Sequence, residues 1–329
     1  MTRKVVFLGM GGTIAGTATS VEDNVGYRAA QVGVQQLLES VPGLARALGT
    51  CQAVSEQVCQ IDSKDLAHAD WFALTARVLH HLQHSDVTGV VITHGTDTLE
   101  ETAYWLSRVM PSDLLAHKAV VLTCAMRPAS SLTPDGPANM ADAVVVATSS
   151  GARGVLVVCA GHIHSAVHVQ KVHPYRVDAF DSGEAGPLGV VEEGRVRLFW
   201  DCPDTRVVHE VHDLSSLQAT GLPRVELLFS HAGASGAMVR SLMQSADGDA
   251  PLRGLVVAGT GNATLHKELE DALLAAQGAG IRVVRVSRCA YGQVVGTATA
   301  LEPDGLEPYA LSAVKARIAL MLDIAATQS

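Results

Sequence analysis

Residues 5–16 read Val-Val-Phe-Leu-Gly-Met-Gly-Gly-Thr-Ile-Ala-Gly, a short apolar run that leads directly into a glycine-rich turn. A nearly continuous apolar run of this length is typical of a strand that is covered on both faces. Further runs of this kind lie at 89–93, 119–124, 155–159, 225–229, 255–258 and 281–286. Between them, the spacing of apolar residues predicts helices over 32–48, 66–82, 99–110, 137–148, 265–277 and 313–324. This alternation predicts an α/β fold with a doubly wound, mostly parallel sheet.

The domain organisation is predicted from the chain length and from one stretch in which the alternation of strands and helices weakens. A chain of 329 residues is long enough for about two domains. The alternation of strands and helices weakens between 201 and 224, where Pro, Gly, Asp and Ser accumulate. We therefore predict a larger N-terminal catalytic domain over 1–203, a linker over 204–224 and a smaller parallel α/β domain over 225–329.

Composition excludes several classes of protein. Hydrophobic residues make up 48% of the chain and charged residues 17%, which excludes a disordered protein. No run of about 18 apolar residues is present, so we expect no membrane partner. The net charge of −9 at pH 7 disfavours a nucleic-acid partner, because an acidic surface repels phosphates. The six cysteines include no CxxC pair and the apolar run at 5–8 is too short for a signal peptide, which together indicate a cytoplasmic protein.

The glycine-rich turn does not fit a nucleotide-binding motif. The pair Gly9-x-Gly11 would need Gly or Ala at position 14 for a dinucleotide fingerprint, and Ile14 is there instead. No GxxxxGK[ST] phosphate loop occurs either. What remains is a turn whose glycines let a ligand approach the backbone closely. We expect Thr13 to lie at the carboxyl edge of the sheet, where open α/β folds bind ligands.

A second predicted strand end carries another polar cluster, because residues 94–98 read His-Gly-Thr-Asp-Thr. Either Asp97 or Thr98 can cap the helix that begins here. Glu100 or Glu101 can then complete a capping box. The helix needs only one capping residue, so Thr96 and the neighbouring carboxylate of Asp97 are available for ligand binding. Such a pair can bind a substrate ammonium group and activate a water.

A third strand end is followed by histidines and by one lysine. Lys171 lies twelve residues past the strand that ends at Cys159. It gains a chemical role only where it reaches the Thr96 edge, because a desolvated lysine can take a proton from a hydroxyl. The histidines at 162, 164, 168 and 173 lack the HExxH spacing of a zinc site and have no carboxylate or cysteine at ligand spacing. A polar loop is the favoured interpretation, and we expect no metal.

Taken together, these motifs resemble those of the bacterial-type L-asparaginase family along nearly the whole chain. Residues 11–16 (Gly-Gly-Thr-Ile-Ala-Gly) are similar to one family signature, and residues 94–104 (His-Gly-Thr-Asp-Thr-Leu-Glu-Glu-Thr-Ala-Tyr) are similar to the other. Shorter matches at 125–128, 135–139, 186–189 and 259–262 support them. The resemblance implies hydrolysis of L-asparagine to L-aspartate and ammonia without a metal or organic cofactor. It also implies self-association as a homodimer or homotetramer in which subunits complete each other's sites.

The resemblance assigns catalytic roles to particular residues. Thr13 matches the nucleophile, on a flexible loop that runs to about residue 30, and Tyr27 matches a lid tyrosine that helps to activate it. Thr96 and Lys171 match a hydroxyl–base pair near the amide. Amide hydrolysis needs such a nucleophile and proton shuttle, and a threonine hydroxyl needs a base or a phenolate-like partner. Backbone N–H groups of the glycine turns can serve as oxyanion donors.

Substrate-binding roles also come from the resemblance. Ser63 matches the residue that binds the α-carboxylate, Asp97 the one that holds the α-amino group, and Asn262 a residue of the second domain directed toward a neighbouring subunit's site. Lys64 stands where many secreted members have Gln, so this cation either strengthens carboxylate binding or repels the α-ammonium. The stretch 288–302 offers no clear match to an acidic residue that some members send to the partner's site.

Two alternatives stand beside L-asparaginase. One is a broader glutaminase–asparaginase or another ω-amidase, because a single extra methylene gives only about 1–3 kcal/mol of discrimination. The other is a non-enzymatic module that binds an amino acid without releasing ammonia. The combination of two threonines with a lysine favours an enzyme, since binding alone does not need these groups.

Overall fold

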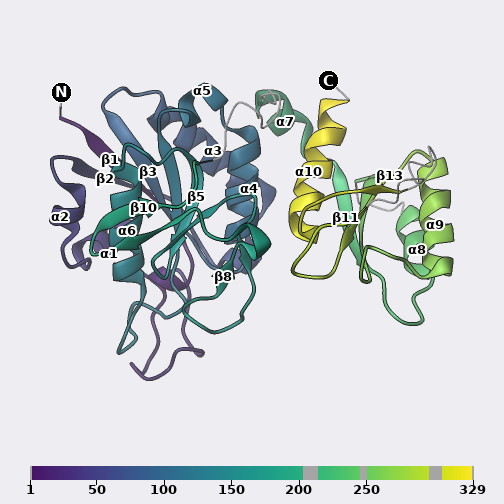
Figure 1. Cartoon of the computed structure of the whole chain (residues 1–329), viewed down its shortest axis with the longest axis horizontal. Helices are drawn as coiled ribbons and strands as arrows, with labels where there is room; N and C mark the ends of the chain where they lie inside the picture. Colours follow the sequence, from purple (N-terminus) through teal and green to yellow (C-terminus); the bar gives the residue numbers. More distant parts are fainter. Residues whose placement is uncertain (1, 203–213, 245–249, 296–305, 328–329) are drawn as a thin grey trace. The chain divides into compact units, whose positions relative to one another are not determined.

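The computed structural model describes residues 2–202, 214–244, 250–295 and 306–327. The chain divides into two compact units, residues 1–211 and 212–329 (Figure 1). Of the predicted linker, residues 204–213 lie outside the described part, and the remainder contains helix α7 (Leu214–Thr220).

The first unit is built on an eight-stranded sheet in the order β10-β9-β6-β5-β4-β3-β1-β2. Five neighbouring strands, β2-β1-β3-β4-β5, are parallel, and β6, β9 and β10 continue the sheet in antiparallel fashion. The strand bounds are β1 (Lys4–Gly11), β2 (Gln52–Ile61), β3 (Val87–Thr93), β4 (Ala119–Thr123), β5 (Gly154–Cys159), β6 (His162–Ser165), β9 (Gly189–Glu192) and β10 (Arg195–Leu198). A separate short pair consists of β7 (Gln170–Lys171) and β8 (Phe180–Asp181).

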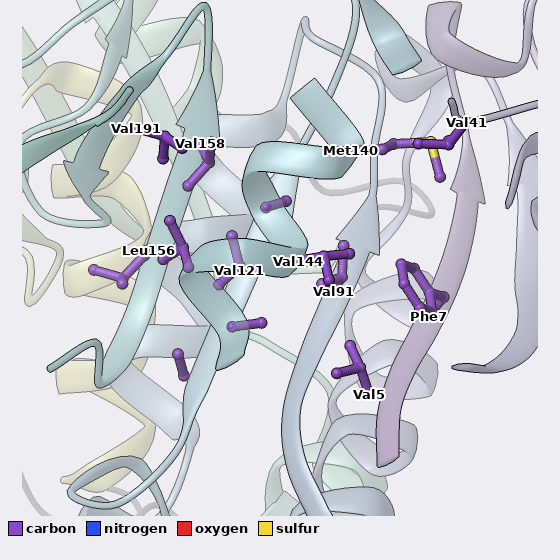
Figure 2. Close-up of a cluster of buried hydrophobic side chains, with 14 of the residues drawn as sticks. Val5, Phe7, Val41, Val91, Val121, Met140, Val144, Leu156, Val158 and Val191 are labelled. Carbon is purple, nitrogen blue, oxygen red and sulfur yellow. The ribbon is translucent and has the colours of Figure 1, made fainter. Parts of the chain in front are cut away.

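Helices cover both faces of this sheet. Helices α1 (Val34–Glu39), α2 (Leu44–Leu48) and α6 (Gly136–Thr148) form one layer, and α3 (His68–Leu82), α4 (Leu99–Val109) and α5 (Ser112–Leu115) form the other (Figure 1). Figure 2 shows the strand side chains Phe7 and Val91 beside Val144 of α6, with Met140 of the same helix next to Val41. Burying one such side chain completely contributes about 1.5–3 kcal/mol. Because the strands are covered on both faces, their sequences read as continuous apolar runs.

The order of the strands locates the binding edge. After β1, the chain forms β2 on one side and then crosses back to form β3 on the other side of β1. This reversal makes the gap between the carboxyl ends of β1 and β3 the topological switch point, the usual ligand position in open α/β sheets. The glycine turn after β1 and the polar cluster after β3 both begin there.

The second unit is a smaller parallel sheet with helices on its two faces. Its strands β11 (Arg224–Phe229), β12 (Leu252–Gly259), β13 (Arg282–Ser287) and β14 (Glu307–Pro308) lie in chain order. An apolar cluster joins the sheet to α8 (Ala237–Gln244) and α9 (Lys267–Gly278), while α10 (Ala313–Ala326) packs on the other face. The predicted two-domain α/β fold is therefore confirmed.

Several predicted elements were wrong in detail. The helix expected over 32–48 is divided into α1 and α2, because Pro42 cannot continue a helix and Gly43 adopts a left-handed φ of 76°. Strand β2 was missed, since every one of its residues is partly or fully exposed and it lacks an apolar run. The antiparallel strands after β5 were also missed, because each is only two to four residues long. In the described residues, no helix combines the length and apolar character needed to cross a bilayer.

Candidate active site

The site is organised around a contact between two glycines. Gly12 has φ +82°, and a side-chain carbon at this position would lie 2.2 Å from the Cα atom of Gly95. A non-glycine residue at 12 would therefore be strained in φ and would also collide with the neighbouring backbone. This close approach brings together the turns that carry Thr13, which opens the 3₁₀ turn η1 (Thr13–Ala15), and Thr96. Both threonines are buried.

Thr13 is paired with a tyrosine from the following loop. Its Oγ1 atom lies 2.6 Å from the phenol oxygen of Tyr27, within hydrogen-bond distance. Two backbone hydrogen bonds between Thr17 and Arg28, of 2.9 and 2.8 Å, close the base of this loop. The tyrosine ring lies against Gly16, where a side-chain carbon would approach it to 2.8 Å.

The electrostatic environment keeps Tyr27 protonated. Burial raises the pKa of Tyr27, the hydrogen bond with Thr13 acts in the opposite direction, and the negative charges of Asp62 and Asp97 raise the pKa further. Near neutral pH the side chain is therefore a neutral phenol. A phenolate-like partner for Thr13, one of the two options expected from the chemistry, is disfavoured by this environment.

Thr96 is paired with a lysine that comes from a distant part of the chain. Lys171, at the end of β7, donates from Nζ to Thr96 Oγ1 at 2.9 Å and to Asp97 Oδ1 at 2.6 Å. Its side chain is 18% exposed and that of Asp97 is 51% exposed. The structure thus brings Lys171 to Thr96. This contact is the condition that the sequence set for a chemical role of this lysine.

Ser63 joins the loop after β2 to the loop after β3. It begins the 3₁₀ turn η2 (Ser63–Asp65) and is 3% exposed. The backbone N–H of Asp97 donates to its Oγ at 3.2 Å, and the hydroxyl of Thr98 donates to its carbonyl at 2.9 Å. The expected capping box is therefore wrong: Thr98 makes no side-chain cap on α4, since its hydroxyl serves Ser63 instead. Glu100 accepts a hydrogen bond from the backbone N–H of Lys171 at 2.8 Å.

Two predicted binding residues have other partners in the structure. The Lys64 side chain is 59% exposed, and its ammonium contacts Asp65 and lies 3.7 Å from Asp62. The hydrogen bond with Asp65 raises the pKa of Lys64, so its charge is directed at these carboxylates. Asn262, in the second unit, forms a closed pair of hydrogen bonds with the backbone of Val295, at 2.8 and 2.7 Å.

The histidine cluster is only partly a loop, because His162 and the buried His164 lie on strand β6, whereas His168 and His173 lie outside the strands. His164 Nδ1 lies 2.8 Å from Ser182 Oγ, and His162 Nδ1 lies 3.1 Å from the carbonyl of Ala160. His173 accepts backbone N–H groups from Tyr175 and Arg176. Across the described ranges, no group of three His, Cys, Asp or Glu residues has the geometry to hold a metal ion.

Comparison with known proteins places this geometry in a family. The model of the asparaginase N-terminal domain matches residues 4–204, and that of the glutaminase/asparaginase C-terminal domain matches residues 224–329. The chain belongs to the asparaginase family. Within it, the chain is 36% identical to L-asparaginase 2 of Escherichia coli (strain K12), over 88% of this chain and 78% of that protein. It is 35% identical to a glutaminase-asparaginase of Pseudomonas fluorescens biotype A, over 98% of this chain and 87% of that protein.

A solved asparaginase structure shows the same fold. The probable cytoplasmic L-asparaginase from Campylobacter jejuni superposes with a TM-score of 0.87 at 34% identity, covering 99% of this chain and 96% of that one. The resemblance expected from the two sequence signatures is confirmed.

Three features of this asparaginase site were missed from sequence. Asp62 acts through its charge on Tyr27, and Glu100 binds the Lys171 backbone, a contact between residues 71 positions apart. His94 is fully buried, which lowers its pKa to about 4, so it is a neutral ring hydrogen-bonded to Thr102. Only His94 and Glu100 gave a signal in advance, since both belong to the second family signature.

Proposed function

We propose that this chain hydrolyses the side-chain amide of L-asparagine to L-aspartate and ammonia, with Thr13 as the nucleophile. The observation that carries the proposal is the arrangement at the switch point, where each of two buried threonine hydroxyls is hydrogen-bonded to a group able to transfer a proton. The names of the relatives, most of them L-asparaginases, support asparagine as the substrate.

Substrate binding uses the groups beside the threonines. A free α-amino acid carries an ammonium and a carboxylate on one carbon. The half-exposed Asp97 carboxylate binds the ammonium, and the Ser63 hydroxyl, together with nearby backbone N–H groups, binds the carboxylate. These two anchors are adjacent because Asp97 N–H is hydrogen-bonded to Ser63 Oγ. They direct the side-chain amide toward the threonine pairs.

The chemistry proceeds in two halves. Thr13 Oγ1 attacks the amide carbon while its proton is transferred through the Tyr27 phenol, and the protonated amine leaves as ammonia when the C–N bond breaks. Backbone N–H groups of the glycine turns stabilise the oxyanion. The resulting acyl ester on Thr13 is attacked by water, whose proton passes through the Thr96 hydroxyl to Lys171. For this step Lys171 must be in its neutral amine form, because an ammonium group cannot accept a proton. The water proton returns to Thr13 as L-aspartate is released.

The assembly and location belong to the same proposal. We infer a homodimer or homotetramer, as in the family that the chain resembles, with Asn262 of the second unit serving a neighbouring subunit. A cytoplasmic location is supported by the Campylobacter jejuni relative, which is described as a probable cytoplasmic enzyme. Size-exclusion chromatography with light scattering tests the assembly. A monomer would contradict it.

An ammonia-release assay tests the function. We expect kcat/KM for L-asparagine to exceed that for L-glutamine, and equal efficiency on the two would replace the proposal by a glutaminase–asparaginase. Thr13→Ala and Thr96→Val should each abolish turnover, because each removes a hydroxyl assigned to chemistry. Circular dichroism should show both variants folded. Full activity in either variant contradicts the role of that threonine, and binding of asparagine without ammonia release by the unmodified chain contradicts the enzyme.

A further inference from the structure

The position of Lys171 depends on elements outside the main sheet. Lys171 ends β7, a strand of two residues that pairs only with the equally short β8. Its ammonium nevertheless reaches Thr96 and Asp97, which lie directly before helix α4 in another part of the chain. A two-stranded pair of this length has little stability of its own. A further contact is therefore needed to hold the lysine backbone at a fixed distance from the threonine.

Glu100 makes that contact. It lies in the first turn of α4, four residues after Thr96, and its Oε2 atom accepts the backbone N–H of Lys171 at 2.8 Å. The helix that follows the Thr96–Asp97 pair thus holds the strand that supplies the ammonium. The lysine is bound at both ends, through its backbone by Glu100 and through its Nζ atom by the two groups at the strand end. This closed loop of contacts fixes the Nζ–Thr96 distance.

We propose that Glu100 is a positioning residue, which sets the place of Lys171 beside Thr96 by accepting its backbone N–H. The role requires an acceptor at the end of a side chain of this length and does not require a negative charge. Small misplacements of a reacting group can lower rates by up to about 100-fold. The kinetic part of this inference rests on the proposed function, whereas the placement of Lys171 does not.

Four variants separate the acceptor from the charge and from helix stability. Glu100→Ala removes the acceptor, Glu100→Gln keeps an acceptor oxygen without the charge, and Glu100→Asp keeps the charge but withdraws the acceptor by one methylene. Asp70→Ala is the matched control, because Asp70 also accepts a backbone N–H at the start of a helix, that of Ala67 at 2.8 Å. Its loss weakens a helix start without touching Lys171.

The first readout needs no turnover. The purified full chain is treated with limiting amine acetylation reagent, and labelling of Lys171 is followed by peptide mass spectrometry. We expect Lys171 to be labelled several times faster in Glu100→Ala and Glu100→Asp, while Glu100→Gln and Asp70→Ala match the unmodified chain. The second readout is ammonia release, in which Glu100→Ala and Glu100→Asp should lose about tenfold or more in kcat with KM changed far less.

Particular results overturn the proposal. Unchanged labelling of Lys171 in Glu100→Ala and Glu100→Asp shows that Glu100 does not place the lysine, and if Glu100→Ala fails to fold, Glu100→Asp decides alone. A Glu100→Gln variant as impaired as Glu100→Ala shows that the charge, not the acceptor, matters. If the unmodified chain releases no ammonia, the proposed function fails, but the labelling result still decides the placement.

Discussion

The pairing of Thr13 with Tyr27 gives the sharpest prediction. Tyr27→Phe removes one hydroxyl and keeps the ring that lies against Gly16. The lost hydrogen bond is 2.6 Å long and joins a buried threonine to a partly exposed tyrosine. A neutral hydrogen bond contributes about 0.5–1.5 kcal/mol, and water can replace the phenol at this partly open position, so we expect a loss of about 1 kcal/mol in unfolding free energy.

The expected kinetic loss is larger than the stability loss. Proton transfer by a positioned side chain contributes about 10²–10⁴-fold to the rate. Because Tyr27 is a neutral phenol that relays a proton rather than a strong base, the lower value applies. A loss of about 100-fold in kcat corresponds to about 2.7 kcal/mol. Tyr309→Phe is the matched control, since it removes a phenol hydrogen bond of 2.7 Å to Asp323 in the second unit.

The dependence on pH distinguishes the relay from a phenolate base. The pKa of Tyr27 is raised in the folded chain, so the folding stability linked to its protonated form is complete at neutral pH. This contribution to stability is lost only as pH rises through the folded-state pKa. Plots of kcat against pH between about 6 and 9 should therefore have the same shape for the unmodified chain and Tyr27→Phe. The reasoning is refuted if Tyr27→Phe retains full kcat, or if it removes a rise of kcat with pH that the unmodified chain shows.

Two further variants test the backbone contact and the exposed lysine. Gly12→Ala should lower the unfolding free energy by more than about 2 kcal/mol and abolish ammonia release, because a Cβ atom would lie 2.2 Å from Gly95 Cα at a left-handed φ. Gly43→Ala has a similar φ of +76° but open space around it, so thermal unfolding should show a smaller loss, and equal losses contradict the contact argument. Lys64→Gln should change KM for asparagine by less than about threefold and more than kcat, since exposed ion pairs contribute little; a pure kcat effect contradicts a binding role.

The elements that could be predicted from sequence are those in which buried residues follow a regular pattern along the chain. Strands β1, β3, β4 and β5 are buried on both faces, so each reads as an apolar run and could be found from pattern alone. Strand β2 is at the sheet edge and has no such pattern, although it completes the switch point at which the site forms. Detecting β2 requires knowing that it pairs with β1, for example Val5 with Ala53. Such long-range contacts are not visible in a local sequence pattern.

The site residues divide in the same way. Thr13 and Thr96 could be placed from sequence because each directly follows a recognisable strand, and parallel strands end at a common edge. That Lys171 reaches Thr96 could not be derived, since 75 residues separate the two and only the short β7–β8 pair carries the lysine. The capping pattern around Thr98 and Glu100 was misread for a related reason. Both side chains have partners far away in sequence, Ser63 and Lys171, which local spacing cannot show.

This division has a consequence for how the site responds to substitution. The two threonines are held by the main sheet and by the Gly12–Gly95 contact, whereas their proton-transfer partners come from peripheral segments, a loop closed at Thr17 and a two-residue strand. Tyr27 and Glu100 act through hydrogen bonds to Thr13 and to the Lys171 backbone, and one hydrogen bond contributes only about 0.5–1.5 kcal/mol to stability. Changes at Tyr27 or Glu100 should therefore reduce kcat with little loss of stability. A change at Gly12 should reduce both together, because there the packing that stabilises the sheet edge also places the reacting groups.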